Sequence, residues 1–269
     1  MTAEGRKYLW YSDTHLNTSW PWSLRSFVRK VNDMKPDGMF LTGDISNGRR
    51  VSDDLSFLAS RIDCPIYFVL GNHDYHMRSL GGVHDSVREV CSRHKNLVWM
   101  TDSGVVSLSE DVALVGTEGW YDAAFGNPDF LRFTMDWMLT YDFFRLPWPS
   151  ILSAWRGMAA ASAEYIGIKV EEALSTHKEV FVLTHFPPWP EADRAHGTVF
   201  ERFWLPYNSN SILGTRIEQV AREFKKKRIT VLAGHTHSER TIRVRKNVEC
   251  RVAPAKYTGS PRLDDVFVI

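Results

Sequence analysis

The chain has 269 residues and a formal net charge of +1, with 33 Lys and Arg against 32 Asp and Glu. Apolar residues make up 43% of the sequence, which excludes a disordered chain, because such chains combine low hydrophobicity with high net charge. The near-zero charge also excludes a protein that binds nucleic acid through bulk positive charge alone.

Short apolar runs alternate with amphipathic segments in the first third of the chain. Three runs, each followed by small polar residues, predict buried strands over 7–11, 39–42 and 66–70. A capping serine and an early proline predict a helix from Ser19 to Pro36, and a second helix is expected over 51–62. Strands that alternate with helices in this way predict a mainly parallel sheet.

The middle of the chain is less regular. Runs at 105–108 and 112–115 predict a strand pair, and a long helix is expected from about 151 to 176. The segment 120–155 is rich in aromatic residues and proline, and linkers are seldom so apolar. We therefore expect an insertion within a single domain over 1–269, which either covers the core or forms a cap that shapes a substrate pocket.

The strand pattern returns in the second half. Runs at 180–183 and 229–233 predict strands, and runs at 241–244, 248–252 and 266–269 predict closing, antiparallel strands. A basic helix is expected to end in Lys225 to Arg228. The proline-rich loop 186–210 offers three side chains that could line a cleft, namely Trp189, Arg194 and Tyr207.

Metal-binding side chains follow five of the predicted strands. They are Asp13 and His15, Asp44, Asn72 and His73, His185, and finally His235 and His237. Ligands of α/β sheets bind beyond the carboxyl ends of the strands, so we expect these residues to meet at one rim. Carboxylate and imidazole groups suit divalent manganese, iron or zinc.

Local spacing suggests how these residues are aimed. The pairs Asp13/His15 and His235/His237 are separated by one residue, so each is expected to project from one side of an extended segment. The glycines before Asp44, Asn72 and His235 are expected to permit sharp backbone turns.

The motifs DTH, GDIS, GNHD, TH and GHTH, in this order from Asp13 to His237, resemble the five motifs of the calcineurin-like metallophosphoesterases. The resemblance implies an α/β fold, a four-layer α/β/β/α sandwich in which helices flank two central mixed sheets. It also implies two divalent metal ions. Residues implied for the first ion are Asp13, His15 and His237; those for the second are Asn72, His185 and His235. Asp44 would bridge the ions, together with a water or hydroxide.

The same resemblance implies a role for the residues after Asn72. His73 would not bind metal but would face the substrate as a general acid, and Asp74 would orient His73 by fixing its tautomer. One departure concerns Asn47, since the cyclic-nucleotide phosphodiesterase branch usually carries aspartate there. Asn47 weakens assignment to that branch but is an accepted variant.

The expected function is hydrolysis of a phosphate ester, either a diester or a monoester. The near-neutral charge favours a small or nucleotide-like substrate. A nuclease or a protein phosphatase of the same superfamily stays open, the latter because Arg49 and Arg50 follow the second motif. A catalytically silent scaffold is disfavoured, because every expected position is filled. The residues leave open which metals are native (manganese, iron, zinc or nickel), and they also leave open the oligomeric state.

Other features are expected to be structural. Five histidines are assigned to ordinary surface or core positions: His76, His84, His94, His177 and His196. The run Lys225 to Arg228 is expected to be a solvated helix end rather than a nucleic-acid contact. Three cysteines form no disulfide framework. No apolar stretch reaches membrane-spanning or signal-peptide length, so a cytoplasmic location is expected.

Overall fold

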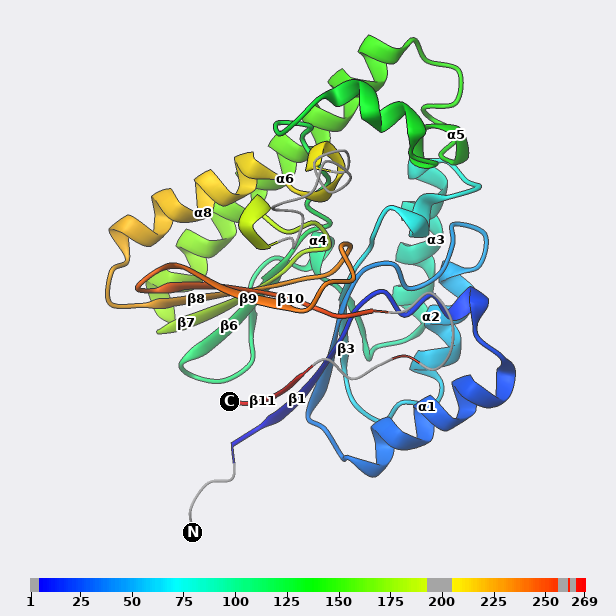
Figure 1. Cartoon of the computed structure of the whole chain (residues 1–269). Helices are drawn as coiled ribbons and strands as arrows, with labels where there is room; N and C mark the ends of the chain where they lie inside the picture. Colours follow the sequence, from blue (N-terminus) through cyan, green and yellow to red (C-terminus); the bar gives the residue numbers. More distant parts are fainter. Residues whose placement is uncertain (1–4, 193–204, 256–260, 262–264) are drawn as a thin grey trace.

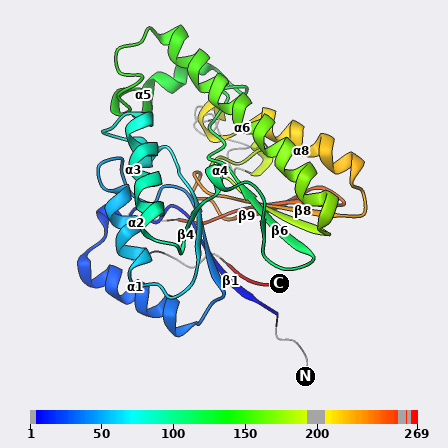
Figure 2. The same ribbon diagram turned by 180° about the vertical axis from the view of Figure 1, so that it is seen from behind.

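The computed structural model of the chain describes residues 5–192, 205–255, 261 and 265–269. Two central β-sheets pack against each other, and helices cover the outer face of each sheet (Figure 1). The view from behind shows the same layers, with α1, α2 and α3 on one side and α6 and α8 on the other (Figure 2). This arrangement confirms the predicted four-layer sandwich.

The first sheet has five strands in the order β11-β1-β2-β3-β4. Four of them are parallel: β1 (Lys7–Tyr11), β2 (Gly38–Thr42), β3 (Ile66–Val69) and β4 (Leu97–Trp99). β11 (Asp265–Val268) lies antiparallel to β1 at the edge. The connecting helices are α1 (Pro21–Asp33), α2 (Val51–Ala59) and α3 (Leu80–Arg93).

The second sheet has six strands in the order β5-β6-β7-β8-β10-β9. Its parallel strands are β6 (Val112–Gly116), β7 (Glu179–Leu183), β8 (Arg228–Ala233) and β10 (Val248–Val252). The edge strands β5 (Val106–Ser107) and β9 (Arg240–Arg245) are antiparallel to their neighbours. The helices on this side are α6 (Trp148–Thr176) and α8 (Ser211–Glu223).

Two predicted details are wrong. β10 was expected among antiparallel closing strands, but it is parallel to β8, because the chain runs from β8 to the edge strand β9 before a hairpin returns it as β10. The basic run is not a helix end either. α8 ends at Glu223, and Arg228 already belongs to β8, because the apolar residues that hold α8 in the core stop at Ala221.

Three hydrophobic clusters separate the four layers. The inner cluster lies between the two sheets and includes Trp10, Phe40, Phe181 and Phe267. The outer clusters lie between each sheet and its own helices. Near the end of β1, the Trp10 indole N–H donates to the Thr42 hydroxyl over 3.0 Å, so this core extends up to the strand ends where the metal-binding motifs begin.

The insertion between β6 and α6 contains the short helices η3 (Pro128–Phe133) and α5 (Asp136–Leu139). It lies between α3 and α6 at the top of Figure 1. Trp120 and Tyr121 are buried in the cluster beneath the first sheet's helices, whereas Phe133 and Phe144 are 69% and 55% exposed. The inner aromatic residues therefore cover the core. The helix that follows, α6, begins at Trp148, slightly before the expected start near 151.

Within the described ranges, no helix is both long enough and apolar enough to cross a lipid bilayer.

Candidate metal centre

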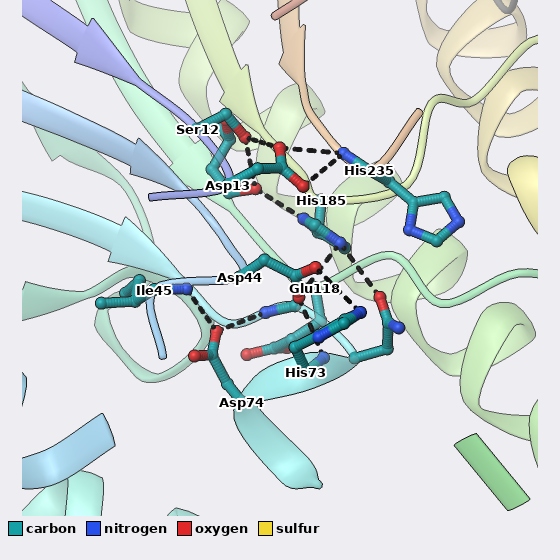
Figure 3. A network of polar contacts seen from close by, with 12 residues as sticks. Ser12, Asp13, Asp44, Ile45, His73, Asp74, Glu118, His185 and His235 are labelled. Carbon is teal, nitrogen blue, oxygen red and sulfur yellow. Dashed lines mark hydrogen bonds and ion pairs between the residues drawn. The ribbon is translucent and has the colours of Figure 1, made fainter. Parts of the chain in front are cut away.

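The motif residues lie just after five parallel strands, at the carboxyl ends of both sheets. β1, β2 and β3 of the first sheet precede Asp13, Asp44 and Asn72, whereas β7 and β8 of the second precede His185 and His235. The two sheets are joined here, since His185 Nδ1 donates to the carbonyl oxygen of Thr42 over 2.8 Å. Figure 3 shows how these side chains approach one another from the different strands.

Asp13, His15 and His237 form the first group of possible metal ligands. One donor atom from each lies within 4.8 Å of the other two, and His237 Nε2 is 3.1 Å from Asp13 Oδ1. The Asp13 carboxylate also accepts hydrogen bonds from the Ser12 hydroxyl at 2.6 Å and the His235 backbone N–H at 3.1 Å. These contacts hold Asp13 in one orientation.

Asp44 takes part in two further groups, one with Asp13 and His185 and the other with His15 and His73. Its Oδ1 is 3.4 Å from His185 Nε2. Its Oδ2 is 3.9 Å from His15 Nε2 and 3.8 Å from His73 Nε2. The two oxygens thus face different histidines, which is the arrangement a bridging carboxylate requires.

Asn72 and His185 present lone pairs to each other. His185 Nε2 is 3.1 Å from Asn72 Oδ1. Burial lowers the pKa of His185, so the ring is neutral, and its one hydrogen is used at Nδ1 for the Thr42 carbonyl. A cation placed between Nε2 and Oδ1 would satisfy both atoms, so the donor set fits a divalent metal ion.

His235 lies close by, but among the described residues its ring belongs to none of the three groups of Asp and His donor atoms. The ring packs on Phe186 and Tyr207, with both centroid separations at 4.4 Å, and Figure 3 shows it directed away from Asp13. Its Nε2 donates to the Tyr207 carbonyl over 3.0 Å, which leaves the lone pair on Nδ1. A ligand role for His235 stays a prediction.

Backbone conformation at the site differs from the extended segments that were expected. Five candidate ligands have positive φ: Asp13 (47°), His15 (40°), Asp44 (49°), His235 (68°) and His237 (54°). Non-glycine residues in this region cost about 1–3 kcal/mol each, and such strain concentrates at functional sites. Left-handed turns, rather than strand alternation, therefore set the directions of these side chains.

The glycines have two different roles here. Gly43, before Asp44, has a φ of +90°, as the expected sharp turn requires. Gly71 is needed for space instead, because a Cβ atom there would collide with Asp44 and lie 2.8 Å from His185 Cε1.

Crowding of carboxylates makes the centre electrostatically suited to cations. Burial, with repulsion from Asp13 and Asp74, raises the pKa of Asp44 well above its usual value. Burial is the largest influence on Asp13 and would raise its pKa. The hydrogen bond from His237 and the charges of His185, His237 and His15 together outweigh burial and lower that pKa. Burial lowers the pKa of His15 to about 4, so this histidine is neutral at pH 7 and able to bind metal.

Asp74 contacts the loops around the site. Its Oδ2 accepts from the backbone N–H groups of Gly71 and Ile45 at 2.9 and 3.2 Å, and its Oδ1 from that of Ser46 at 2.7 Å. The carboxylate therefore joins the loops after β2 and β3. The expected effect of Asp74 on the tautomer of His73 stays a prediction.

His73 is placed at the edge of the centre. Its side chain is 32% exposed, against 15% for His237 and 3% or less for Asp13, His15, Asp44 and His185. Its ring packs 4.9 Å from that of His15 and 4.5 Å from that of His76. It is therefore the member of the site that a substrate can reach most readily.

Two residues at the site were missed or misjudged from the sequence. His76 was assigned an ordinary position, but it is buried beside His73 and its Nε2 is 2.7 Å from Asp136 Oδ1. Asp136 itself, 1% exposed, was not singled out. The signal available was a lone carboxylate in the apolar segment Met135–Leu139, since buried carboxylates need partners.

The structure places the other residues singled out from the sequence in different surroundings. His84, His94 and His177 occupy ordinary positions, hydrogen-bonded to Tyr75, Ser56 and Ser107. Trp189 packs in the core of the second sheet rather than in a cleft, whereas the Tyr207 hydroxyl accepts from Asn72 Nδ2 at 2.8 Å. Arg194 and His196 lie outside the described residues.

Comparisons with known proteins identify the family and the fold of the chain. The model of the calcineurin-like phosphoesterase family matches residues 6–239. No curated protein matches the sequence. Among solved structures, a phosphopantetheinyl hydrolase from Mycobacterium tuberculosis is similar with a TM-score of 0.68 at 15% identity, covering 95% of this chain and 91% of that chain.

Two other structures share the fold at lower similarity. A dimetal phosphatase from Danio rerio has a TM-score of 0.57 at 11% identity, covering 93% of this chain and 88% of its own. The protein TT1561 from Thermus thermophilus has a TM-score of 0.54 at 16% identity, with 93% and 89% covered.

Proposed function

The chain belongs to the calcineurin-like phosphoesterase family, and from this membership we propose that it hydrolyses phosphate esters at a centre for two divalent metal ions. The observation that carries the proposal is the meeting of three overlapping groups of Asp and His donor atoms beyond the strand ends. A phosphopantetheinyl hydrolase and a dimetal phosphatase share the fold, which supports hydrolysis of phosphoester bonds.

We assign ligands to the two ions as the motifs and contacts suggest. Asp13, His15 and His237 hold the first ion, Asn72, His185 and His235 hold the second, and Asp44 is shared. Two divalent ions so bound neutralise charge on phosphoryl oxygens and supply a hydroxide nucleophile at neutral pH.

The chain's own contribution to bond cleavage is assigned to His73. From the exposed edge of the site, it protonates the leaving oxygen, a role worth roughly 10²–10⁴-fold in rate. Burial and the nearby His76 and His15 lower the pKa of His73 to about 3 in the resting protein. A negatively charged phosphate beside the ring would raise that pKa, which favours the protonated form of His73 in the complex with substrate.

The substrate proposed is a small or nucleotide-like ester rather than a long nucleic acid. The basic run Lys225 to Arg228 lies at the start of β8, because Arg228 is the first residue of that strand. His235 follows the other end of the same strand. Six residues of strand span about 20 Å. This basic run therefore lies too far away to contact the phosphate group of an ester bound beside His235.

A substrate panel tests the proposal. Metal-free protein is assayed with bis(p-nitrophenyl) phosphate and p-nitrophenyl phosphate, alone and with manganese, iron, nickel or zinc. We expect no hydrolysis without metal and clear hydrolysis of at least one ester with at least one metal. Absence of hydrolysis under every condition, with the protein folded, would favour a binding scaffold instead.

A further inference from the structure

Asp136 connects the insertion to the candidate metal centre. Its Oδ1 accepts hydrogen bonds from Asn72 Nδ2 at 3.0 Å and from His76 Nε2 at 2.7 Å, and its Oδ2 accepts from the Tyr121 hydroxyl at 3.1 Å. The residue is 1% exposed. A buried carboxylate is tolerated only with such partners, and one of these partners is a candidate metal ligand.

These contacts determine which way the Asn72 amide faces. Its two amide hydrogens go to Asp136 and to the Tyr207 hydroxyl at 2.8 Å. The carbonyl oxygen is thereby directed to the other side, 3.1 Å from His185 Nε2. A rotated amide would set its oxygen against the Asp136 carboxylate, which has no hydrogen to offer, so the rotated form is disfavoured.

We infer that Asp136 is a positioning residue that holds Asn72 Oδ1 toward the second metal ion, so that the insertion helps to build the metal centre. The inference rests on the proposed function. The same carboxylate bonds His76, whose ring packs 4.5 Å from that of His73, so Asp136 also supports the side of the site where the substrate enters.

Docking of the insertion does not depend on Asp136 alone. The Met77 N–H donates to the Leu139 carbonyl at 2.7 Å, and the Tyr141 N–H donates to the Arg78 carbonyl at 3.1 Å. The exposed Asp142 accepts from the Leu80 N–H at 2.7 Å. Asp142 is therefore a matched control, since it fastens the same insertion without touching a candidate ligand.

Manganese binding to metal-free protein tests the inference. Wild type, Asp136→Ala and Asp142→Ala are titrated with Mn²⁺, with binding followed by calorimetry and the metal environment by electron paramagnetic resonance. Removing partners that orient a metal ligand typically costs about 10–100-fold in affinity. We expect that loss at one of the two sites in Asp136→Ala, with the other within about threefold, and no loss in Asp142→Ala.

The conservative variant provides a rescue. In Asp136→Asn the amide oxygen can still accept from Asn72 Nδ2, and the new amide group can donate to the Tyr121 hydroxyl. Both variants remove the same charge, so we expect Asp136→Asn to recover at least about tenfold of the affinity that Asp136→Ala loses. If Asp136→Ala proves unfolded, Tyr207→Phe removes the other hydrogen bond of the Asn72 amide and should weaken the same single site.

The outcomes separate the inference from the function it rests on. A wild-type chain that binds no Mn²⁺ overturns the proposed metal centre. A wild type that binds two ions, with Asp136→Ala unchanged, with both sites weakened equally, or with Asp136→Asn no tighter than Asp136→Ala, overturns only the positioning role.

Discussion

His185 Nε2 lies 3.1 Å from Asn72 Oδ1, although 113 positions separate the two residues in the sequence. Both atoms offer a lone pair, because the hydrogen of the neutral His185 ring is on Nδ1, facing Thr42. A cation between the two atoms would satisfy both lone pairs. The predictions below test this reading and its consequences.

Gly71→Ala should disrupt the metal centre. The added Cβ would collide with Asp44 and lie 2.8 Å from His185 Cε1, closer than unbonded atoms tolerate. Overpacking of this kind typically costs about 1–3 kcal/mol of stability, and we expect Mn²⁺ affinity to fall as well. Denaturant unfolding and calorimetric titration measure the two effects.

Gly157→Ala is the matched control for Gly71→Ala. An added Cβ at Gly157 meets nothing within 4 Å, and the residue lies inside helix α6. We expect a gain of about 0.5–1 kcal/mol from helix propensity, with unchanged metal affinity. If Gly71→Ala and Gly157→Ala had equal effects on stability and on Mn²⁺ affinity, the steric argument for Gly71 would be contradicted.

Metal binding at pH 7 should release protons. Burial and the neighbouring carboxylates raise the pKa of Asp44 well above its usual value, which favours a proton on that carboxyl in the metal-free protein, and a bound cation must displace it. His15 contributes little, because its pKa is lowered to about 4. Apparent Mn²⁺ affinity should therefore rise as pH increases until Asp44 is fully ionised.

Calorimetry in buffers with different ionisation enthalpies measures this release directly. The observed enthalpy of Mn²⁺ binding should depend linearly on the buffer's ionisation enthalpy. Identical enthalpies in all buffers would show that Asp44 is already ionised in the metal-free protein.

His73→Ala should reduce turnover in a way that depends on the leaving group. For an ester with a poor, alkoxide-like leaving group we expect a loss of roughly 10²–10⁴-fold in kcat. For a p-nitrophenyl ester the loss should be much smaller, since that group departs without a proton. Equal losses with both esters would rule out the proton-donor role.

The metal content of His73→Ala supplies a second check. His73 also lies in a donor group with His15 and Asp44, so the geometry allows it to be a ligand. We expect the variant to keep two ions per chain. Loss of one ion would assign His73 to the metal centre and not to proton transfer.

Trp155→Ala should destabilise the fold, because it removes a buried ring from the aromatic cluster that covers the core. Trp155 is fully buried, and its ring lies 4.9 Å from that of Tyr121 and 5.7 Å from that of Phe143. Truncating a buried tryptophan costs about 3–5 kcal/mol. Phe144→Ala, at a position 55% exposed, should cost less than about 0.5 kcal/mol; similar costs in urea unfolding would contradict this account.

Much of the site could be predicted from the sequence because its ligands follow buried strands. Short apolar strands end two residues before Asp13, Asp44 and His185, and parallel strands bring their carboxyl ends together. The conformation of these loops could not be predicted in the same way. The positive φ of Asp13 is strain held by tertiary contacts, which no local propensity indicates.

The contribution of the insertion to the site could not be predicted from the sequence pattern either. Asp136 and Asn72 are 64 positions apart, and the helix that carries Asp136 has only four residues, too short to show periodicity. Similarly, the pairing of β10 with β8 depends on the path of the chain around β9. Such relationships are set by how elements pack and not by the residues within any one of them.

Crystals grown with Mn²⁺ provide the most direct test of the central claim, through anomalous scattering recorded at the manganese edge. The account predicts two manganese peaks per chain, one beside Asp13 and His237 and the other beside Asn72 and His185, with Asp44 between them. A site without manganese, or manganese bound only elsewhere on the chain, would contradict it.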